Sequence, residues 1–200
     1  MNPIRYYSTN NKSERVTFET ALMKGLGSNY GLYMIAREDI PLLQASTIKG
    51  MKDLSYAQIA FEVLFPFLAE EVPRNDLVGI LEDAYDERAI PTTVQHVTGK
   101  TYIMWLSNGP TYSFKDYAAR FFARILNYFL KRSGTRRLVA VATSGDTGGA
   151  VADALHNQES VDNVVFFPKG SITERQRRQM TTLQDNIYAF EVNGDFDVCQ

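Results

Sequence analysis

The stretch "RLVAVATSGDTGGAVADALHNQESVDNVVFFP" at residues 137–168 decides the fold class. It opens with a continuous apolar run at 137–143, which is typical of a strand buried in a parallel sheet. A glycine-rich turn at 144–149, a helical segment near 148–157 and a second strand at 163–168 follow. Because a strand, a helix and a parallel strand form a right-handed crossover unit, this stretch predicts an α/β fold.

The same rhythm continues on the C-terminal side. A capping box between Ser171 and Glu174 is expected to open a helix in "ITERQRRQMTT", and "NIYAFEV" at 186–192 is expected to be the third strand. Asp195 or Asp197 is placed to cap a further helix, of which only a few residues follow. We therefore expect a parallel βαβαβ unit that is incomplete at its C-terminus, in a chain that is a fragment of a longer protein.

A hairpin and a long helix are expected before this unit. The segments "TVQHVTG" and "TYIMWLS" alternate as two strands around Gly99 and Lys100. The helix that follows is expected to begin with a capping box between Ser113 and Asp116 and to end before Gly134. Its apolar residues fall on one face, which predicts packing against a core.

The first part of the chain is expected to be mostly helical. Thr17 and Ser55 are suited to cap helices, and Pro66 should kink the second of them. We therefore assign residues 1–94 to an N-terminal mostly helical domain and residues 95–200 to the first part of the α/β region.

Composition and charge narrow the function classes. The net charge of −2 gives no electrostatic reason to expect nucleic acid or an anionic membrane as a partner. The single cysteine, Cys199, fits a reducing compartment, and the histidines His96 and His156 lack ligand-like neighbours, so no metal is expected. No secretory signal or membrane span is apparent, and we expect a cytoplasmic protein.

The turn "SGDTGG" at 144–149 is the first candidate site. It lies between a strand and a helix, where open α/β sheets bind ligands, and its glycines let the backbone approach one. N–H groups at the helix start and the hydroxyls of Ser144 and Thr147 could bind a carboxylate or phosphate. The turn is neither a dinucleotide fingerprint nor a Walker loop. It is either such an anion site or a tight turn capped by Asp146 or Thr147.

Lys115, in "GPTYSFKDYAARFF" at 109–122, is the second candidate. It stands at a helix start, where the helix dipole is unfavourable to a cation, and Tyr112, Phe114 and Tyr117 can desolvate it. Both effects disfavour the charged ammonium, and a neutral amine is what Schiff-base chemistry requires. The alternative is an ordinary solvated lysine.

Together these segments resemble a known family. The pairing of "GPTYSFKDYAARF" with "ATSGDTGGAVA", with "FFPKGSITERQRRQMTT" and "GDFDVCQ" behind them, is similar to threonine synthases of the longer bacterial and fungal type. The resemblance implies a fold-type II pyridoxal-phosphate enzyme, similar in fold to the tryptophan synthase β subunit. It also implies a role in threonine biosynthesis, namely conversion of O-phospho-L-homoserine and water to L-threonine and phosphate.

The resemblance also implies roles for the candidate residues. Lys115 would hold pyridoxal 5'-phosphate as a Schiff base and later move protons on the substrate, and Asp146 would lie beside the ring oxygen of the cofactor. The substrate carboxylate would be held by the turn residues Ser144, Gly145, Thr147 and Gly148. Residues 95–200 would then be the first part of the pyridoxal-phosphate-dependent catalytic region, and the assembly a monomer or a homodimer.

The sequence departs from the family pattern at three places, which are Asn10, Tyr30-Gly31 and Asn108. The groups that bind the cofactor phosphate and the pyridine nitrogen lie further downstream in the family, so we expect the 200 residues to be inactive alone. Two alternatives remain open. One is a related phospho-lyase acting on another phosphorylated hydroxy-amino acid, and the other is a non-catalytic binding module of the same fold.

Overall fold

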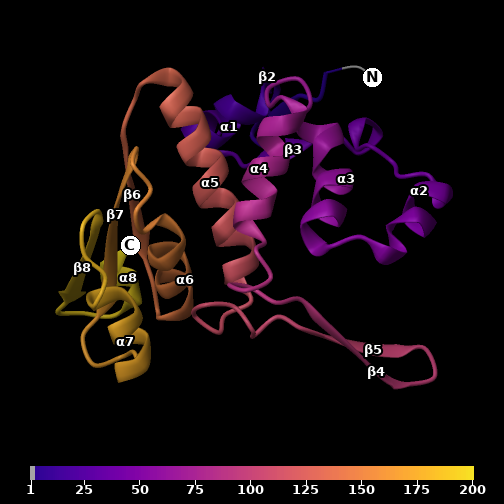
Figure 1. The fold of residues 1–200 in the computed structure, drawn as a ribbon. Helices are drawn as coiled ribbons and strands as arrows, with labels where there is room; N and C mark the ends of the chain where they lie inside the picture. Colours follow the sequence, from indigo (N-terminus) through magenta and orange to yellow (C-terminus); the bar gives the residue numbers. More distant parts are fainter. Residues whose placement is uncertain (1–2) are drawn as a thin grey trace. The chain divides into compact units, whose positions relative to one another are not determined.

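The computed structural model describes residues 3–200, and the chain forms two compact units, Met1–Glu82 and Asp83–Gln200 (Figure 1). Within residues 3–200, every helix is too short or too polar to cross a lipid bilayer. The functional division into residues 1–94 and 95–200 stays a prediction.

The first unit contains a small antiparallel sheet that the sequence analysis did not predict. Its order is β2-β1-β3, with β1 at Tyr6–Ser8, β2 at Asn11–Val16 and β3 at Tyr33–Ile35. These strands are short, and β2 has the polar sequence "NKSERV", so no alternation of apolar residues marks them. The hydroxyl of Ser8 is buried and donates to the carbonyl of Ser28 at 2.9 Å.

Two of the four α-helices described in this unit begin at the predicted capping residues. The four are α1 (Phe18–Lys24), α2 (Ala45–Gly50), α3 (Tyr56–Leu68) and α4 (Arg74–Ala84). The Thr17 hydroxyl accepts the N–H of Thr20, and Ser55 forms a capping box with Gln58, which confirms both caps. The helix α3 continues through Pro66.

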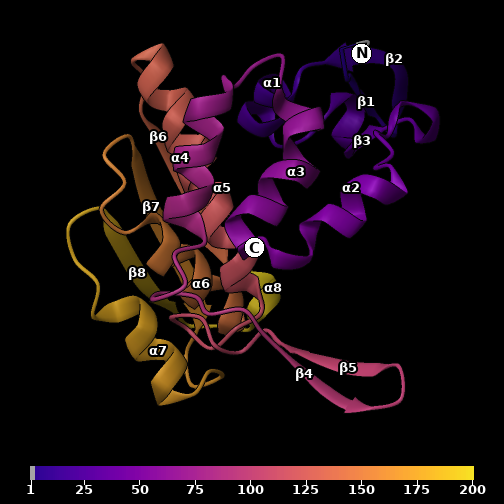
Figure 2. The same ribbon diagram turned by 45° about the vertical axis from the view of Figure 1, so that its right-hand side comes forward.

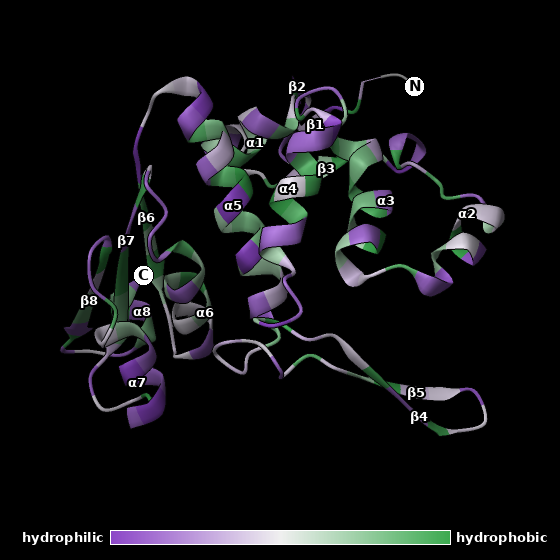
Figure 3. Ribbon diagram, viewed as in Figure 1, coloured by the Kyte–Doolittle hydropathy of each residue, from purple (hydrophilic) through white to green (hydrophobic). Residues whose placement is uncertain are grey.

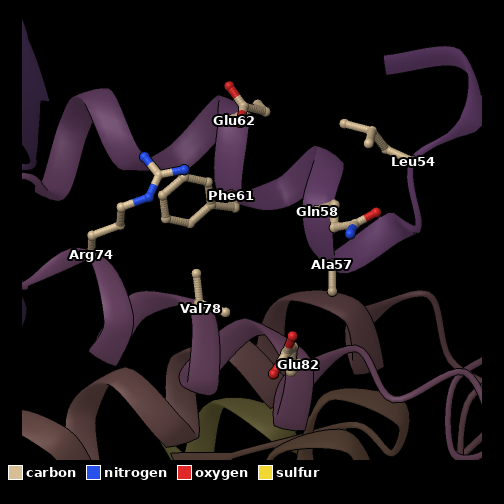
Figure 4. A pocket seen from close by; sticks show the side chains of 8 residues that line it. All are labelled: Leu54, Ala57, Gln58, Phe61, Glu62, Arg74, Val78 and Glu82. Carbon is tan, nitrogen blue, oxygen red and sulfur yellow. The ribbon is translucent and has the colours of Figure 1, made fainter. Parts of the chain in front are cut away.

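A cavity of about 270 Å³ lies between α3 and α4. Figure 4 shows the guanidinium of Arg74 against the ring of Phe61, and its centre is 4.5 Å from the ring centroid. Phe61 also stacks on Phe65 at 4.9 Å, so the arginine covers an aromatic pair. None of the predicted site residues lines this cavity.

The second unit begins with the expected hairpin, formed by β4 (Thr93–Thr98) and β5 (Thr101–Trp105). Gly99 at the turn has a φ of 54°, the left-handed conformation that favours glycine. Every residue of both strands is exposed in this chain. The hairpin is therefore held by its own pairing and by contacts at its base.

The helix α5 (Lys115–Ser133) ends at Gly134 as predicted, but its start differs. The expected capping box of Ser113 with Asp116 is wrong, because the capping position is Phe114 and the Asp116 carboxylate binds elsewhere. It accepts the N–H of Thr111 at 3.0 Å and the Thr111 hydroxyl at 2.5 Å. The carboxylate therefore holds the preceding loop against the helix instead of capping it.

The predicted parallel sheet is confirmed. The strands β6 (Arg137–Ala142), β7 (Val161–Pro168) and β8 (Ile187–Val192) lie in the order β6-β7-β8. The connecting helices are α6 (Asp146–Leu155) and α7 (Glu174–Thr181), and α8 (Phe196–Cys199) follows β8. The helix α6 packs against both α5 and α7 (Figure 2).

Two details of this unit differ from expectation. β6 is an edge strand of the described sheet and is largely exposed, whereas β7 is central and buried. The capping box of α7 joins Thr173 to Gln176 instead of Ser171 to Glu174. Glu174 is then free to pair with arginines on its own helix, and α7 is almost wholly hydrophilic (Figure 3).

The last predicted cap is resolved in favour of Asp195. Its side chain accepts the N–H of Val198 at 3.1 Å at the start of α8. The fold is thus an α/β fold with a parallel sheet, as the sequence predicted.

Candidate functional site

The hydroxyl of Thr143 organises the glycine-rich turn between β6 and α6. Its oxygen accepts the N–H of Gly145 at 3.0 Å and the N–H of Gly148 at 2.9 Å. Gly145 has a φ of 136°, which L-residues with a side chain rarely adopt. The two glycine N–H groups are therefore used within the turn itself.

The remaining donors of the turn are those of Ser144, Asp146 and Thr147. Within residues 3–200 the structure shows no acceptor for their backbone N–H groups, and all three residues are exposed. They open a ten-residue helix, whose N-terminus is favourable to negative charge. With the hydroxyls of Ser144 and Thr147, this end of α6 has the donor set for an anionic group.

Gly148 also fixes how closely α6 approaches the sheet. A Cβ added there would lie less than 3.0 Å from side-chain atoms of Thr143, Val165 and Met180. No other residue type fits without displacing these neighbours. The glycine in this motif thus has a packing role, independent of any ligand.

The carboxylate of Asp146 is held by α7. Gln176 Nε2 donates to Asp146 Oδ1 at 2.8 Å. The other end of the same amide, Gln176 Oε1, accepts the N–H and the hydroxyl of Thr173 at 3.0 and 2.9 Å. Since the capping box uses the amide oxygen, the amide nitrogen is left to face Asp146.

Lys115 is the first residue of α5 and is half-buried. Its Nζ lies 4.4 Å from the ring centroid of Phe114, and no carboxylate of the described residues lies within ion-pair distance. Tyr117 turns into the core, where its hydroxyl donates to the carbonyl of Pro91 at 3.1 Å.

The helix α7 joins the loop before Lys115 to the glycine-rich turn. Gln179 Nε2 donates to the carbonyl of Thr111 at 3.0 Å, and the Arg175 guanidinium lies 4.8 Å from the ring centroid of Tyr112. A cavity of about 200 Å³ lies among these groups. It is lined by Thr111, Tyr112, Asp146, Thr173, Arg175, Gln176 and Gln179.

This cavity brings together some of the predicted site residues. It contains Asp146 and the loop that leads to Lys115, but Lys115 itself is not among the lining residues. Sequence reasoning missed Arg175, Gln176 and Gln179, which it treated as part of a helix only. The spacing of Gln176 and Gln179, three residues apart on one helix face, was the available signal.

The neighbouring helix pair contains buried charge. Burial raises the pKa of Asp153 on α6, and the nearby Asp116 carboxylate raises it further. Burial likewise lowers the pKa of Arg120 on α5, whose guanidinium donates to the carbonyls of Ala84 and Asp83 at 2.6 and 3.0 Å. Within residues 3–200 no group of three or more His, Cys, Asp or Glu side chains is arranged to hold a metal.

Known proteins are similar to this chain over nearly all of its length. A family model described as "Threonine synthase N terminus" matches residues 5–85. The threonine synthase of Pseudomonas aeruginosa is 36% identical over 200 residues, which cover 98% of this chain and 42% of that protein. Residues 5–85 thus match the N-terminal domain of threonine synthases, and nearly the whole chain is similar to the corresponding part of one of them. The chain spans about 42% of the length of this relative.

The fold comparison agrees over almost the whole chain. The crystal structure of pyridoxal-phosphate-bound threonine synthase from Brucella melitensis superimposes with a TM-score of 0.89 at 32% identity. The match covers 98% of this chain and 42% of that one. "Threonine synthase-like 2" of Mus musculus is also similar, at 36% identity over 96% of this chain and 40% of its own. The match thus extends beyond residues 5–85 and includes both candidate site segments of this chain.

Proposed function

We propose that this chain supplies the lysine and the substrate-binding turn of a threonine synthase, which converts O-phospho-L-homoserine and water to L-threonine and phosphate. The observation that carries the proposal is the junction at α7, which links the Asp146 turn and the loop before Lys115 around one cavity. The relatives named threonine synthase support the same reaction.

The residues present suit pyridoxal 5'-phosphate at its aldehyde end. Lys115 has a half-buried side-chain amine, and no carboxylate of the described residues forms an ion pair with it. When bound, the cofactor supplies the electron sink for chemistry at the α and β carbons of the substrate. We assign the covalent attachment to Lys115, together with the movement of protons at these two carbons.

The glycine-rich turn is proposed to bind the substrate carboxylate. The exposed N–H groups of Ser144, Asp146 and Thr147 and two hydroxyls would donate to it at the start of α6. Gly145 and Gly148 would act through the shape of the turn, since their own N–H groups bind Thr143. This arrangement orients the substrate without requiring a cationic side chain at the turn.

Asp146 is proposed to tune the cofactor instead of acting as the main base. Gln176 fixes its carboxylate at 2.8 Å, which keeps one oxygen engaged while the other remains available. A carboxylate held in this way would hydrogen-bond to the ring oxygen of the cofactor and would so influence the electronics of its ring.

We further propose that the 200-residue chain does not catalyse the reaction by itself. The family's groups for the cofactor phosphate and the pyridine nitrogen are expected outside the portion matched here, and one reversible lysine linkage holds a cofactor weakly. A cytoplasmic location and a monomeric or homodimeric assembly remain part of the proposal.

The test uses the full-length gene product with pyridoxal phosphate. Phosphate release and threonine formation from O-phosphohomoserine are measured together, and both should appear at equal rates. Phosphate release without threonine would favour the second candidate, a phospho-lyase of the same family. The similarity to "Threonine synthase-like 2", a relative with a distinct name, is the reason to keep that candidate. Absence of any cofactor bound to lysine would favour a non-catalytic binding module.

A further inference from the structure

The helix α7 has three arginines, and one of them has no carboxylate partner among the described residues. Glu174 pairs with Arg177 and Arg178, at 2.7 and 2.8 Å. These interactions lower the pKa of Glu174 to about 2. Within residues 3–200, Arg175 shows neither an ion pair nor a hydrogen bond from its guanidinium, and its recorded contact is with an aromatic ring.

That ring belongs to Tyr112 and is held in an uncommon conformation. Tyr112 has a φ of 63°, which is rare for a bulky residue, and the residue is 61% exposed. The guanidinium carbon of Arg175 lies 4.8 Å from the ring centroid. Stacking of this kind fixes the plane of the guanidinium and leaves its donor edges free.

The position of Arg175 places the free N–H groups of its guanidinium at the cavity. Arg175 lines the cavity that contains Asp146, the residue next to the proposed carboxylate turn. The side-chain nitrogens of Gln176 and Gln179, which line the same cavity, are already engaged with Asp146 and with the carbonyl of Thr111. Arg175 is thus the cationic donor among the residues that line the cavity. The Asp146 carboxylate is the anionic group of the same lining and would repel a bound anion, so the anion would bind at the Arg175 end.

We propose that Arg175 binds the phosphate group of the phosphorylated amino acid that this site accepts. A planar guanidinium binds a phosphate through two parallel hydrogen bonds, which a free and stacked arginine is ready to form. The identity of the amino acid rests on the proposed function, but the binding of a phosphate monoester at Arg175 does not.

The experiment compares Arg175→Gln with Arg177→Gln in the full-length protein. Both variants remove one positive charge from α7, but Arg177 pairs with Glu174 and does not line the cavity. Binding of inorganic phosphate to the cofactor-loaded protein is measured by calorimetry, and KM and kcat are measured with O-phosphohomoserine. Thermal unfolding of both variants checks that each is folded.

Arg175→Gln should weaken phosphate binding and raise KM, each by on the order of tenfold or more, while kcat changes little. Arg177→Gln should match the unmodified protein within about twofold, because its charge serves an exposed ion pair. Arg175→Lys should recover part of the binding, since it restores the charge without the planar fork. Binding of homoserine, which lacks the phosphate, should be equal in all variants.

Equal phosphate binding by Arg175→Gln and the unmodified protein would overturn the proposal, as would equal losses in the Arg177→Gln control. Equal losses for homoserine would also overturn it, because they would assign Arg175 to the carboxylate. Since phosphate binding is measured without turnover, a failure of threonine formation leaves this result intact and counts only against the proposed function.

Discussion

The side-chain amide of Gln176 donates to Asp146 at 2.8 Å while its oxygen caps the helix that carries it. One residue therefore fixes both the start of α7 and the carboxylate of the glycine-rich turn. The capping box determines the orientation of the amide, and this orientation determines which atom faces Asp146. A local helix cap thus contributes directly to the geometry of the site.

This relationship predicts energetic coupling between Gln176 and Asp146. Gln176→Ala and Asp146→Ala should show an interaction energy of about 0.5–1.5 kcal/mol in a double-mutant cycle of chemical unfolding. Thr173→Ala, which removes the capping hydroxyl, should cost about 1 kcal/mol and should weaken this coupling, because that hydroxyl helps to orient the Gln176 amide. Additive effects of the two single substitutions would show that the hydrogen bond makes no net contribution to the free energy of unfolding.

Lys115→Ala should abolish covalent attachment of pyridoxal phosphate and turnover in the full-length protein. Alanine is a good helix former at this helix start, so the free energy of unfolding should change by less than about 1 kcal/mol. Borohydride reduction followed by peptide mapping should label Lys115. Lys100→Ala, in the exposed hairpin turn, is the matched control and should retain full labelling. A label found on another lysine would contradict the assignment.

Gly148→Ala and Gly79→Ala should change stability in opposite directions. The added Cβ at Gly148 would lie within 3.0 Å of packed side chains, so a loss of about 1–3 kcal/mol is expected. At Gly79, inside α4, nothing lies within 4 Å, and alanine should stabilise the helix by about 0.5–1 kcal/mol. Chemical denaturation measures the change in the free energy of unfolding for each variant. Equal changes would refute the packing role of Gly148.

Glu14 should make the first unit sensitive to acid. Hydrogen bonds from the backbone N–H of Ser28, at 2.9 Å, and from the Tyr33 hydroxyl, at 2.8 Å, lower its pKa from 4.5 to about 2. Because the folded-state pKa is depressed, the stabilisation is present above pH 4.5 and is lost as the pH falls toward 2. Glu14→Gln should flatten the pH dependence of unfolding in that window. An unchanged profile would mean that these hydrogen bonds do not favour the ionised form.

Much of the fold could be predicted because its elements carry strong local signals. The sheet strands, the hairpin and the caps at Thr17, Ser55 and Asp195 follow from apolar runs, glycine positions and short polar side chains. The sheet β2-β1-β3 was missed because β2 is polar and because β1 and β3 are only three residues long. Both errors in capping arose where a carboxylate had a better partner, Thr111 for Asp116 and two arginines for Glu174.

The site was predictable only in part. Motifs identify Lys115 and the glycine-rich turn, but motifs do not state distances between segments. The contacts through α7 join residues as far apart in sequence as Thr111 and Gln179, and they depend on how two loops pack against one helix. The placement of the free guanidinium of Arg175 also depends on the conformation of Tyr112, which no sequence pattern indicates.

The hydroxyl of Tyr117 has a mechanical consequence for the start of α5. It lies 3.1 Å from the carbonyl of Pro91 and 3.4 Å from that of Trp105, so one side chain fastens both strands of the exposed hairpin at their base. A two-stranded hairpin without a covering layer is marginally stable and opens readily. Because the base of the hairpin is bound to Tyr117, a buried residue in the first turn of α5, the hairpin can fray from its tip while Lys115 keeps its position.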